Sequence, residues 1–338
     1  MKSYSRCTRC ILSSSFPGIS FDEQGVCSFC RDQSILQTED DVINKAKIQV
    51  EELFNGAKSK NTYDAVMLYS GGKDSTYTMY KAVTEYGLKI LAFTLDNGYI
   101  PQVSFDNIKK ITDHLGVDLL VFRPTLSHMK RIIKASALEP IYNKRTLMRI
   151  SSVCNSCISI VNIQALRIAL EKNIPVILAG FTLGQIPVNS IIYKNNYLFM
   201  EESRSKSLGL LKKSCGDWID TYFSLPESLV KNVTSWPTMV NLLCLEKVSE
   251  EKILETITPL GWKAPVDVDG CSSNCQLNTF NNHIHEKTFG YNPYELELSQ
   301  MIRKGLLDRE SALEKVEKKV PAVLQKIASD LELPENIL

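Results

Sequence analysis

The sequence has almost no net charge, no long hydrophobic run and no low-complexity segment in its C-terminal tail. Its 39 lysines and arginines balance 38 acidic residues. The resulting net charge of +1 excludes a global basic field that would attract nucleic acid, although a local patch remains possible. No apolar run reaches the roughly 20 residues that span a bilayer, and residues 1–6 do not lead into a signal-peptide core. We therefore expect a cytoplasmic protein without a membrane partner.

Ten cysteines stand out in an otherwise ordinary composition. In a reducing compartment they indicate metal or thiol chemistry rather than disulfides. A chain of 338 residues can bury a substantial core and form two or three domains. We expect a zinc ribbon over 1–35, an α/β domain over 36–195, and a mostly helical region over 196–338 that contributes to the active site.

The strongest motif is the glycine-rich segment 69–76, which reads Tyr-Ser-Gly-Gly-Lys-Asp-Ser-Thr. It follows the apolar run 65–68 and precedes a helical pattern. Gly71 and Gly72 allow the backbone to approach a ligand and to direct several N–H groups at it. The helix N-terminus and Lys73 add positive charge, and Asp74 can cap the helix or hold Mg²⁺. The segment suits a polyphosphate, but its spacing differs from that of a Walker P-loop.

From residue 63 onward, apolar strand-like runs alternate with helical patterns. The expected strands are 64–69, 89–95, 118–122 and 174–179, and the expected helices are 75–86, 103–115, 126–137 and 157–172. Such alternation predicts an α/β fold in which a parallel sheet carries helices on both faces. Ligands then bind beyond the carboxyl ends of the strands. Three segments reach that edge: the glycine turn, 95–99 with Asp96, and 180–185 with Gly180 and Gln185.

The first thiol group consists of two Cys-x-x-Cys pairs separated by turn-rich sequence: Cys7, Cys10, Cys27 and Cys30. This spacing predicts a zinc ribbon with four thiolate ligands. Because such a site has no open position, its role would be structural. An iron–sulfur centre is the lesser alternative.

The second thiol group begins with Cys154 and Cys157, which open the helix ahead of the last strand. The helix N-terminus and the nearby cations at 144, 145 and 149 are expected to favour their thiolates. Three explanations stay open: a redox or persulfide dithiol, part of an iron–sulfur site, or buried inert cysteines. Cys271 and Cys275 follow in a loop-like Gly/Ser/Asn-rich segment. A three-thiolate site on a [4Fe–4S] cluster would leave one iron open.

Ser-Gly-Gly-Lys-Asp-Ser at 70–75 resembles the PP-loop of the ATP pyrophosphatase superfamily. The resemblance implies a HUP-like fold and cleavage of ATP between the α and β phosphates. ATP and Mg²⁺ would then be bound by Ser70, Gly71, Gly72, Lys73, Asp74 and Ser75. In such enzymes the position of Asp96 lies near the nucleoside, and the 180–185 loop approaches the α-phosphate and substrate. Asp96 is equally consistent with a turn cap, and Gln185 with an ordinary surface glutamine.

The order of these motifs also resembles the iron–sulfur-dependent thiouridine synthases of the same superfamily. That resemblance covers about half the chain and implies a [4Fe–4S] cluster on Cys154, Cys157 and Cys275, with Cys271 in reserve. A second resemblance, to N-acetyl sugar amidotransferases of surface-polysaccharide synthesis, rests on the ribbon motif, the PP-loop and Ile-Arg-x-Gly-x-x-x-Arg-Glu-x-Ala at 302–312. Such enzymes receive ammonia from a glutaminase partner and need no cluster, so the extra thiols depart from that pattern.

We therefore expect an enzyme that adenylates a carbonyl-type oxygen and inserts sulfur, with ammonia transfer as the alternative. A small-molecule acceptor is favoured over tRNA, because phosphate contacts carry most nucleic-acid affinity and the chain is neutral. A sulfur donor or a glutaminase is the expected protein partner. Cys215 and Cys244 are expected to be buried packing residues. The expected C-terminal helices are 204–214, 227–233, 237–257, 294–304, 308–317 and 320–331, and the amphipathic tail is a candidate homodimer surface.

Overall fold

The computed structural model describes residues 6–32, 34–58, 62–334 and 337, without the side chains of 34–38. One six-stranded sheet lies at its centre, in the order β3-β2-β1-β4-β6-β5. All neighbouring strands are parallel except β5, which pairs antiparallel with β6 at the edge. The strands are β1 Ala65–Leu68, β2 Ile90–Leu95, β3 Asp118–Phe122, β4 Val176–Ala179, β5 Ile192–Lys194 and β6 Thr238–Asn241.

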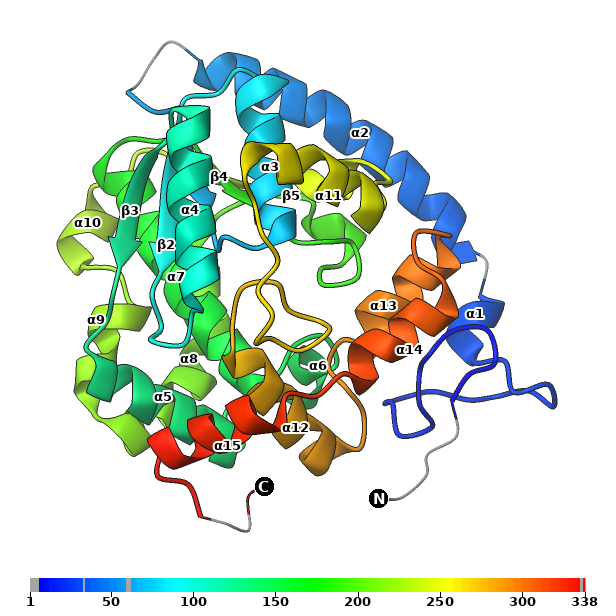
Figure 1. The fold of residues 1–338 in the computed structure, drawn as a ribbon. Helices are drawn as coiled ribbons and strands as arrows, with labels where there is room; N and C mark the ends of the chain where they lie inside the picture. Colours follow the sequence, from blue (N-terminus) through cyan, green and yellow to red (C-terminus); the bar gives the residue numbers. More distant parts are fainter. Residues whose placement is uncertain (1–5, 33, 59–61, 335–336, 338) are drawn as a thin grey trace.

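The sheet is covered by helices on both faces, as the alternating sequence pattern predicted (Figure 1). Alternate residues of β1 enter different cores: Ala65 and Met67 pack with residues of α3 and α4, whereas Val66 and Leu68 pack with residues of α7. Every residue of β1, β2 and β4 is buried, which is the pattern of a parallel sheet buried on both faces. The helices of this region are α3 Lys73–Thr84, α4 Gln102–Leu115, α5 Leu126–Leu138, α6 Lys144–Leu147 and α7 Ser152–Glu171.

The helix predicted over 237–257 is wrong. Its first part is the strand β6, followed by a 3₁₀ turn at Leu242–Leu245, and only Glu250–Ile257 forms a helix, α11. A short apolar run gives no periodicity that separates a buried strand from a buried helix, and here pairing with β4 decides the outcome. The sheet therefore takes its sixth strand from beyond residue 195.

The rest of the C-terminal region is mostly helical. Its helices are α8 Tyr197–Cys215, α9 Asp220–Phe223, α10 Glu227–Lys231, α12 Leu277–Phe289, α13 Glu295–Arg303, α14 Arg309–Glu317 and α15 Pro321–Asp330. Further 3₁₀ turns lie at Val188–Ser190, Asp217–Ile219 and Thr258–Leu260. The sequence did not predict α12, whose first turn follows the Gly/Ser/Asn-rich loop. The apolar side chains of the tail, such as Val323 and Ile327, are buried within this chain, where α15 contacts α12.

Cys215 and Cys244 are both about 1% exposed, which confirms the prediction that they are packing residues. Among the described residues, α7 alone has the length and mean hydropathy of a membrane span. It contacts β1, β2 and β4 and supplies buried residues to two cores, a pattern equally typical of a core helix.

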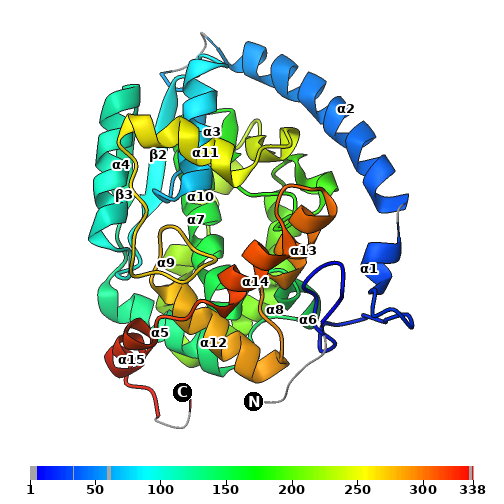
Figure 2. The ribbon, with the colours of Figure 1, turned by 45° about the vertical axis from the view of Figure 1, so that its right-hand side comes forward.

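The N-terminal segment docks on the C-terminal helices at the edge of the molecule (Figure 2). It contains the one-turn helix α1 Ser28–Arg31, and α2 Ser34–Ala57 then runs along the outside of the domain. Arg6 lies 2.8 Å from the buried carboxylate of Glu295, which also accepts a hydrogen bond from the Ser13 backbone N–H. Arg309 donates to the carbonyl oxygens of Cys7 and Cys10. The C-terminal motif 302–312 therefore has a structural role in holding this segment.

We predict that Glu295→Ala loosens this attachment. The change leaves the Arg6 guanidinium and the buried Ser13 N–H without their acceptor, and we expect a loss of about 3 kcal/mol in the free energy of unfolding. Urea denaturation measures this loss, and limited proteolysis locates it in the N-terminal segment. The exposed Glu314→Ala, also on a C-terminal helix, is the control. An equal effect of both substitutions would contradict the assigned role of Glu295.

Candidate functional site

The glycine turn joins β1 to α3 at the carboxyl edge of the sheet. Gly71 has φ +74°, and a Cβ there would lie 2.7 Å from the Ile108 side chain and 2.8 Å from the Ser104 carbonyl oxygen. Gly72 occupies the N-cap of α3 and supplies no side-chain cap. The first amides of α3 therefore face the turn as an anion site with a partial positive charge.

Two residues from late in the chain hold this turn, and sequence reasoning did not assign them to it. The indole N–H of Trp262 donates to the Gly71 carbonyl oxygen at 2.9 Å. The Lys73 backbone N–H donates to the hydroxyl oxygen of Ser273 at 3.1 Å. No local sequence pattern predicts such contacts, because they join residues about two hundred positions apart.

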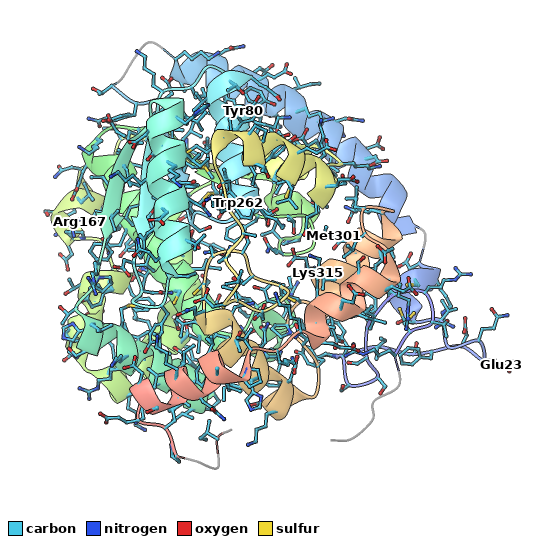
Figure 3. The ribbon with its side chains drawn as sticks, in the orientation of Figure 1. Glu23, Tyr80, Arg167, Trp262, Met301 and Lys315 are labelled. Atoms are coloured by element: carbon cyan, nitrogen blue, oxygen red, sulfur yellow. The ribbon has the colours of Figure 1, made fainter. Side chains whose placement is uncertain are left out.

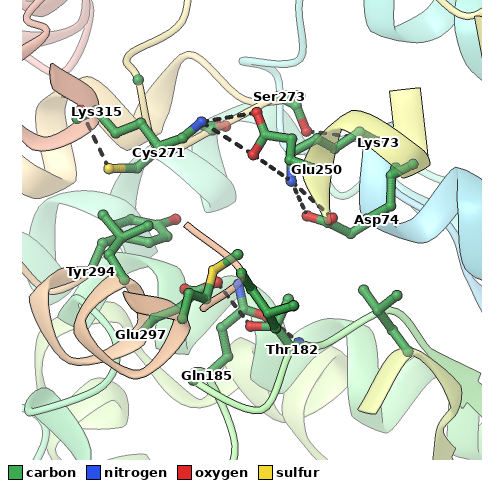
Figure 4. A pocket seen from close by; sticks show the side chains of 18 of the residues that line it. Lys73, Asp74, Thr182, Gln185, Glu250, Cys271, Ser273, Tyr294, Glu297 and Lys315 are labelled. Carbon is green, nitrogen blue, oxygen red and sulfur yellow. Dashed lines mark hydrogen bonds and ion pairs between the residues drawn. The ribbon is translucent and has the colours of Figure 1, made fainter. Parts of the chain in front are cut away.

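Lys73 lies among acidic groups in the cavity of Figure 4. Its Nζ is 2.8 Å from Asp74 and 3.5 Å from Glu250, and Glu250 also contacts Lys315 at 2.9 Å. Burial alone would lower the pKa of Lys73, but the two carboxylates outweigh it and keep the ammonium charged. Figure 3 shows Trp262 and Lys315 around the middle of the molecule. A phosphate group would find two ammonium groups here, currently bridged by one carboxylate.

A second cavity, of about 280 Å³, brings the glycine turn together with the second thiol group. Cys154 and Cys157 come from the first turns of α7, which begins at Ser152 with Ser151 as its side-chain cap. Cys275 comes from the loop before α12. The wall of the cavity also includes Ser70, Gly72, Asp74, Ser75, Gly180 and Gln185. Six of the predicted phosphate-site and loop residues and all three favoured cysteines thus line one space.

Amide side chains contact these thiols. Asn281 donates to the Cys154 sulfur at 3.0 Å, and Asn97 donates to the Cys275 sulfur at 3.5 Å. The buried carboxylate of Asp269 accepts hydrogen bonds from the backbone of the Cys271 loop and from Asn278 on α12. This carboxylate fixes the loop that carries Cys271 and Cys275. Cys271 also lines the cavity, but its thiol donates to the Lys315 carbonyl oxygen at 3.5 Å.

The expectation that nearby cations favour the Cys154 and Cys157 thiolates is wrong for the metal-free protein. Burial raises the pKa of both thiols, and the charges of Cys154 and Cys275 raise that of Cys157 further. Burial also raises the pKa of Cys275 to about 11. Desolvation of the thiolates is the main cause and their mutual repulsion adds to it, and a bound cation would offset both.

The three thiols fit a multi-iron cluster better than a single ion. In the described part of the chain, only the N-terminal cysteines bring their ligand atoms within 4.8 Å of one another. Cys154, Cys157 and Cys275 share a cavity without all lying within 4.8 Å of one another, which is compatible with thiolates bound to different irons of one cluster. Soft sulfur donors with amide N–H groups beside them are the donor set of iron–sulfur centres.

Cys7, Cys10, Cys27 and Cys30 form a compact tetrad, three of them fully buried. The backbone N–H groups of Arg9, Cys10 and Cys27 point at the Cys7 sulfur, at 3.2–3.5 Å. This tetrad could hold one tetrahedral metal ion. Figure 3 shows Glu23 of the same segment at the outer edge of the molecule.

The remaining predicted site residues, Asp96, Gly180 and Gln185, each have a structural contact. Asp96 accepts from the Gly98 N–H at 2.9 Å and pairs with Arg123 at 3.3 Å, so it serves as a turn cap, and its neighbour Asn97 lines the cavity instead. Gly180 packs so closely that a Cβ would lie 2.9 Å from the Ser75 backbone. The Gln185 side chain accepts from the Thr182 N–H at 3.1 Å, inside the loop.

Glu297 is a site residue that sequence reasoning missed. It comes from α13, accepts a hydrogen bond from the Thr182 hydroxyl at 2.9 Å, and packs against Gly184. Burial, with a contribution from the Asp74 charge, raises its pKa to about 7. A carboxyl group with this pKa, beside the phosphate site, can take up or release a proton near neutral pH.

Comparisons with known proteins agree with the fold. Residues 64–181 match the family model of the phosphoadenosine phosphosulfate reductase domain. An uncharacterised protein of Methanocaldococcus jannaschii is 24% identical over 85% of this chain and 84% of its own length.

Two solved structures show a weaker similarity to this chain. The U34-tRNA thiolase NcsA of Methanococcus maripaludis with its [4Fe-4S] cluster has 14% identity and TM-score 0.37, covering 98% of this chain and 90% of its own. An NMN synthetase from Francisella tularensis has 12% identity and TM-score 0.38, covering 90% and 98%. Similarity this low assigns no chemistry to this chain, so its chemistry has to be argued from its own residues.

We predict that Glu297 makes stability pH-dependent. Below about pH 4.5 the carboxyl is protonated in the folded and unfolded states. Between there and pH 7 only the unfolded chain ionises, so the free energy of unfolding should fall as pH rises, by about 3 kcal/mol. Glu297→Gln should remove this part of the pH dependence.

Urea denaturation at pH 5 and pH 8 measures the effect, with the exposed Glu317→Gln as the control. If the Glu297 variant keeps the slope of the unsubstituted protein, the carboxyl does not titrate as described.

Proposed function

We propose that this chain, whose residues 64–181 form a PP-loop domain of the phosphoadenosine phosphosulfate reductase type, is an ATP pyrophosphatase that inserts sulfur into its substrate. The observation that supports this most is the cavity shared by the glycine turn and Cys154, Cys157 and Cys275. Three soft ligands from distant parts of the chain would have no reason to meet beside a phosphate site in an enzyme that transfers nitrogen.

The chain's own groups account for the activation step. The α3 amides and Lys73 bind the phosphates, Asp74 holds Mg²⁺, and the hydroxyls of Ser70 and Ser75 add donors. A carbonyl-type oxygen of the acceptor bonds to the α-phosphorus, the bond to the β-phosphate oxygen breaks, and pyrophosphate leaves. A sulfur nucleophile then displaces AMP. Glu297 holds or releases the proton that these steps move near the phosphates.

A [4Fe–4S] cluster would be held by Cys154, Cys157 and Cys275. Such a cluster would supply an iron with an open coordination position that can bind sulfide. Asn281 and Asn97 donate to the ligand sulfurs, and the Asp269 network orients the loop that carries Cys275. Cys271, whose thiol donates to the Lys315 carbonyl oxygen, is the weaker third ligand.

The alternative, ammonia transfer from a glutaminase partner to an N-acetyl sugar, has less support from the contacts. Its C-terminal motif is accounted for by the contacts of Arg309 with the N-terminal segment. The ammonia route also leaves the three cavity thiols without a role. On our proposal the expected partner is a sulfur donor instead.

We predict that anaerobic reconstitution with iron and sulfide gives a brown protein with the visible absorbance of an iron–sulfur centre. Cys154→Ala, Cys157→Ala and Cys275→Ala should each lose most of that absorbance, because each removes one of three ligands. Cys271→Ala, in the same loop, should retain it and is the matched control. Thiolated product and pyrophosphate are measured in parallel. A colourless protein that is fully active without iron would overturn sulfur insertion and favour ammonia transfer.

We also predict one zinc ion per chain in the N-terminal tetrad, independent of iron. Cys10→Ser should lose the zinc and lower Tm, because ion binding and folding of such a segment are coupled. Cys215→Ser, a buried cysteine outside the tetrad, should keep the zinc. Metal analysis of protein purified without oxygen measures both metals. Equal zinc content in both variants would show that the tetrad does not hold the ion.

A further inference from the structure

A larger cavity, of about 710 Å³, adjoins the thiol cavity along α7. Its walls come from α6, α7, the loop after β4, and the β5–α8 segment. It shares five lining residues with the thiol cavity: Cys154, Ile158, Phe181, Gln185 and Tyr294. A molecule in the larger cavity would therefore reach the residues at which the two cavities meet.

Two arginines line this cavity, Arg145 on α6 and Arg149 in the turn that follows it. Arg149 donates to the Gly184 carbonyl oxygen at 2.9 Å, and over residues 62–334 no ion pair with a carboxylate is seen for Arg149 or Arg145. Burial lowers the pKa of Arg149, and the neighbouring Arg145 charge lowers it further, against a raising effect of Glu39. Lys194 adds a third cation, and among the described residues the one lining carboxyl is that of Glu297, whose pKa is raised to about 7. The cavity thus offers unbalanced positive charge to an anion.

The same walls carry carbonyl oxygens without partners. Asn241 is 2% exposed and donates its amide N–H to the Ser190 carbonyl oxygen, but its own Oδ1 accepts no hydrogen bond within the described chain. Asn162, on the cavity side of α7, has an equally unpartnered Oδ1. A buried acceptor without a donor is costly, so a ligand with hydroxyl or N–H groups would stabilise both. Phe199, 67% exposed, and Tyr193, 40% exposed, add aromatic surface.

We propose that this cavity binds the acceptor substrate of the proposed reaction. The acceptor would be a single-unit phosphorylated molecule with hydroxyl or N–H donors, that is, a mononucleotide or a sugar phosphate. Its phosphate lies at Arg145 and Arg149, its donors face Asn162 and Asn241, and its reacting end points toward Cys154. The volume is that of a small-molecule site. The identification of the ligand as the acceptor rests on the proposed function. The prediction that the cavity binds a phosphorylated molecule does not.

Calorimetric titration of the full chain tests the site. The probes are uridine 5′-monophosphate and glucose 1-phosphate, with uridine and glucose as uncharged controls. A non-hydrolysable ATP analogue is present throughout, so that the glycine turn is occupied and cannot bind the probe. We expect one phosphorylated probe to bind at least tenfold more tightly than its uncharged counterpart. Which one binds distinguishes a nucleotide from a sugar phosphate.

Variants assign the binding to this cavity. Arg145→Gln should weaken the bound probe about tenfold by removing a charge-assisted contact, and Asn162→Leu should weaken it several-fold at unchanged Tm. Lys144→Gln is the matched control: it removes the same charge from the neighbouring exposed position of α6, outside the cavity lining. Equal effects of the Arg145 and Lys144 substitutions would overturn the assignment.

No binding of either phosphorylated probe at millimolar concentration would also overturn the proposal. So would tighter binding of tRNA that depends on Arg145. Neither outcome involves iron or ATP turnover. A protein that binds a probe through Arg145 but carries no cluster would keep this site and refute sulfur insertion, so the two failures are distinguishable.

Discussion

The contacts between the glycine turn and the segment 262–275 are the constraint on which the site depends. A turn with two glycines is flexible in isolation and would lose much of its backbone entropy on binding phosphate. Here Trp262 fixes the Gly71 carbonyl, and Ser273 receives the first α3 amide. The same segment carries Cys275 into the cavity, so the segment that orders the turn also positions the third thiol.

The sequence predicted those features that local patterns determine. The α/β alternation, the turn at 69–76 and the cysteine tetrad could all be recognised because each combines periodicity or spacing with residue chemistry. The strand β6 could not, since the four residues Thr-Met-Val-Asn at 238–241 carry no periodicity that separates a strand from a helix until β4 pairs with them. Glu250, Glu297 and Asn281 also escaped, because a charged or amide residue on an amphipathic helix resembles a surface residue until the fold buries it.

The same limit applies to electrostatics. Helix N-termini and nearby cations indicated reactive thiolates at Cys154 and Cys157, but burial raises the pKa of both. Desolvation acts on the whole side chain, whereas the helix N-terminus contributes only a partial charge. A sequence shows which charges are near in the chain and does not show which of them the fold removes from water. In the metal-free state these thiols are protonated, and deprotonation has to accompany metal binding.

The position of α7 explains how one fold can separate activation from acceptor recognition. Along this helix Cys157 lines the thiol cavity, Asn155 and Asn162 line the larger cavity, and Cys154 lines both. Because α7 also packs on β1, β2 and β4, both sets of side chains are fixed relative to the strand ends that carry the glycine turn. A rigid core helix that lines both cavities can therefore orient an acceptor without moving the groups that bind ATP.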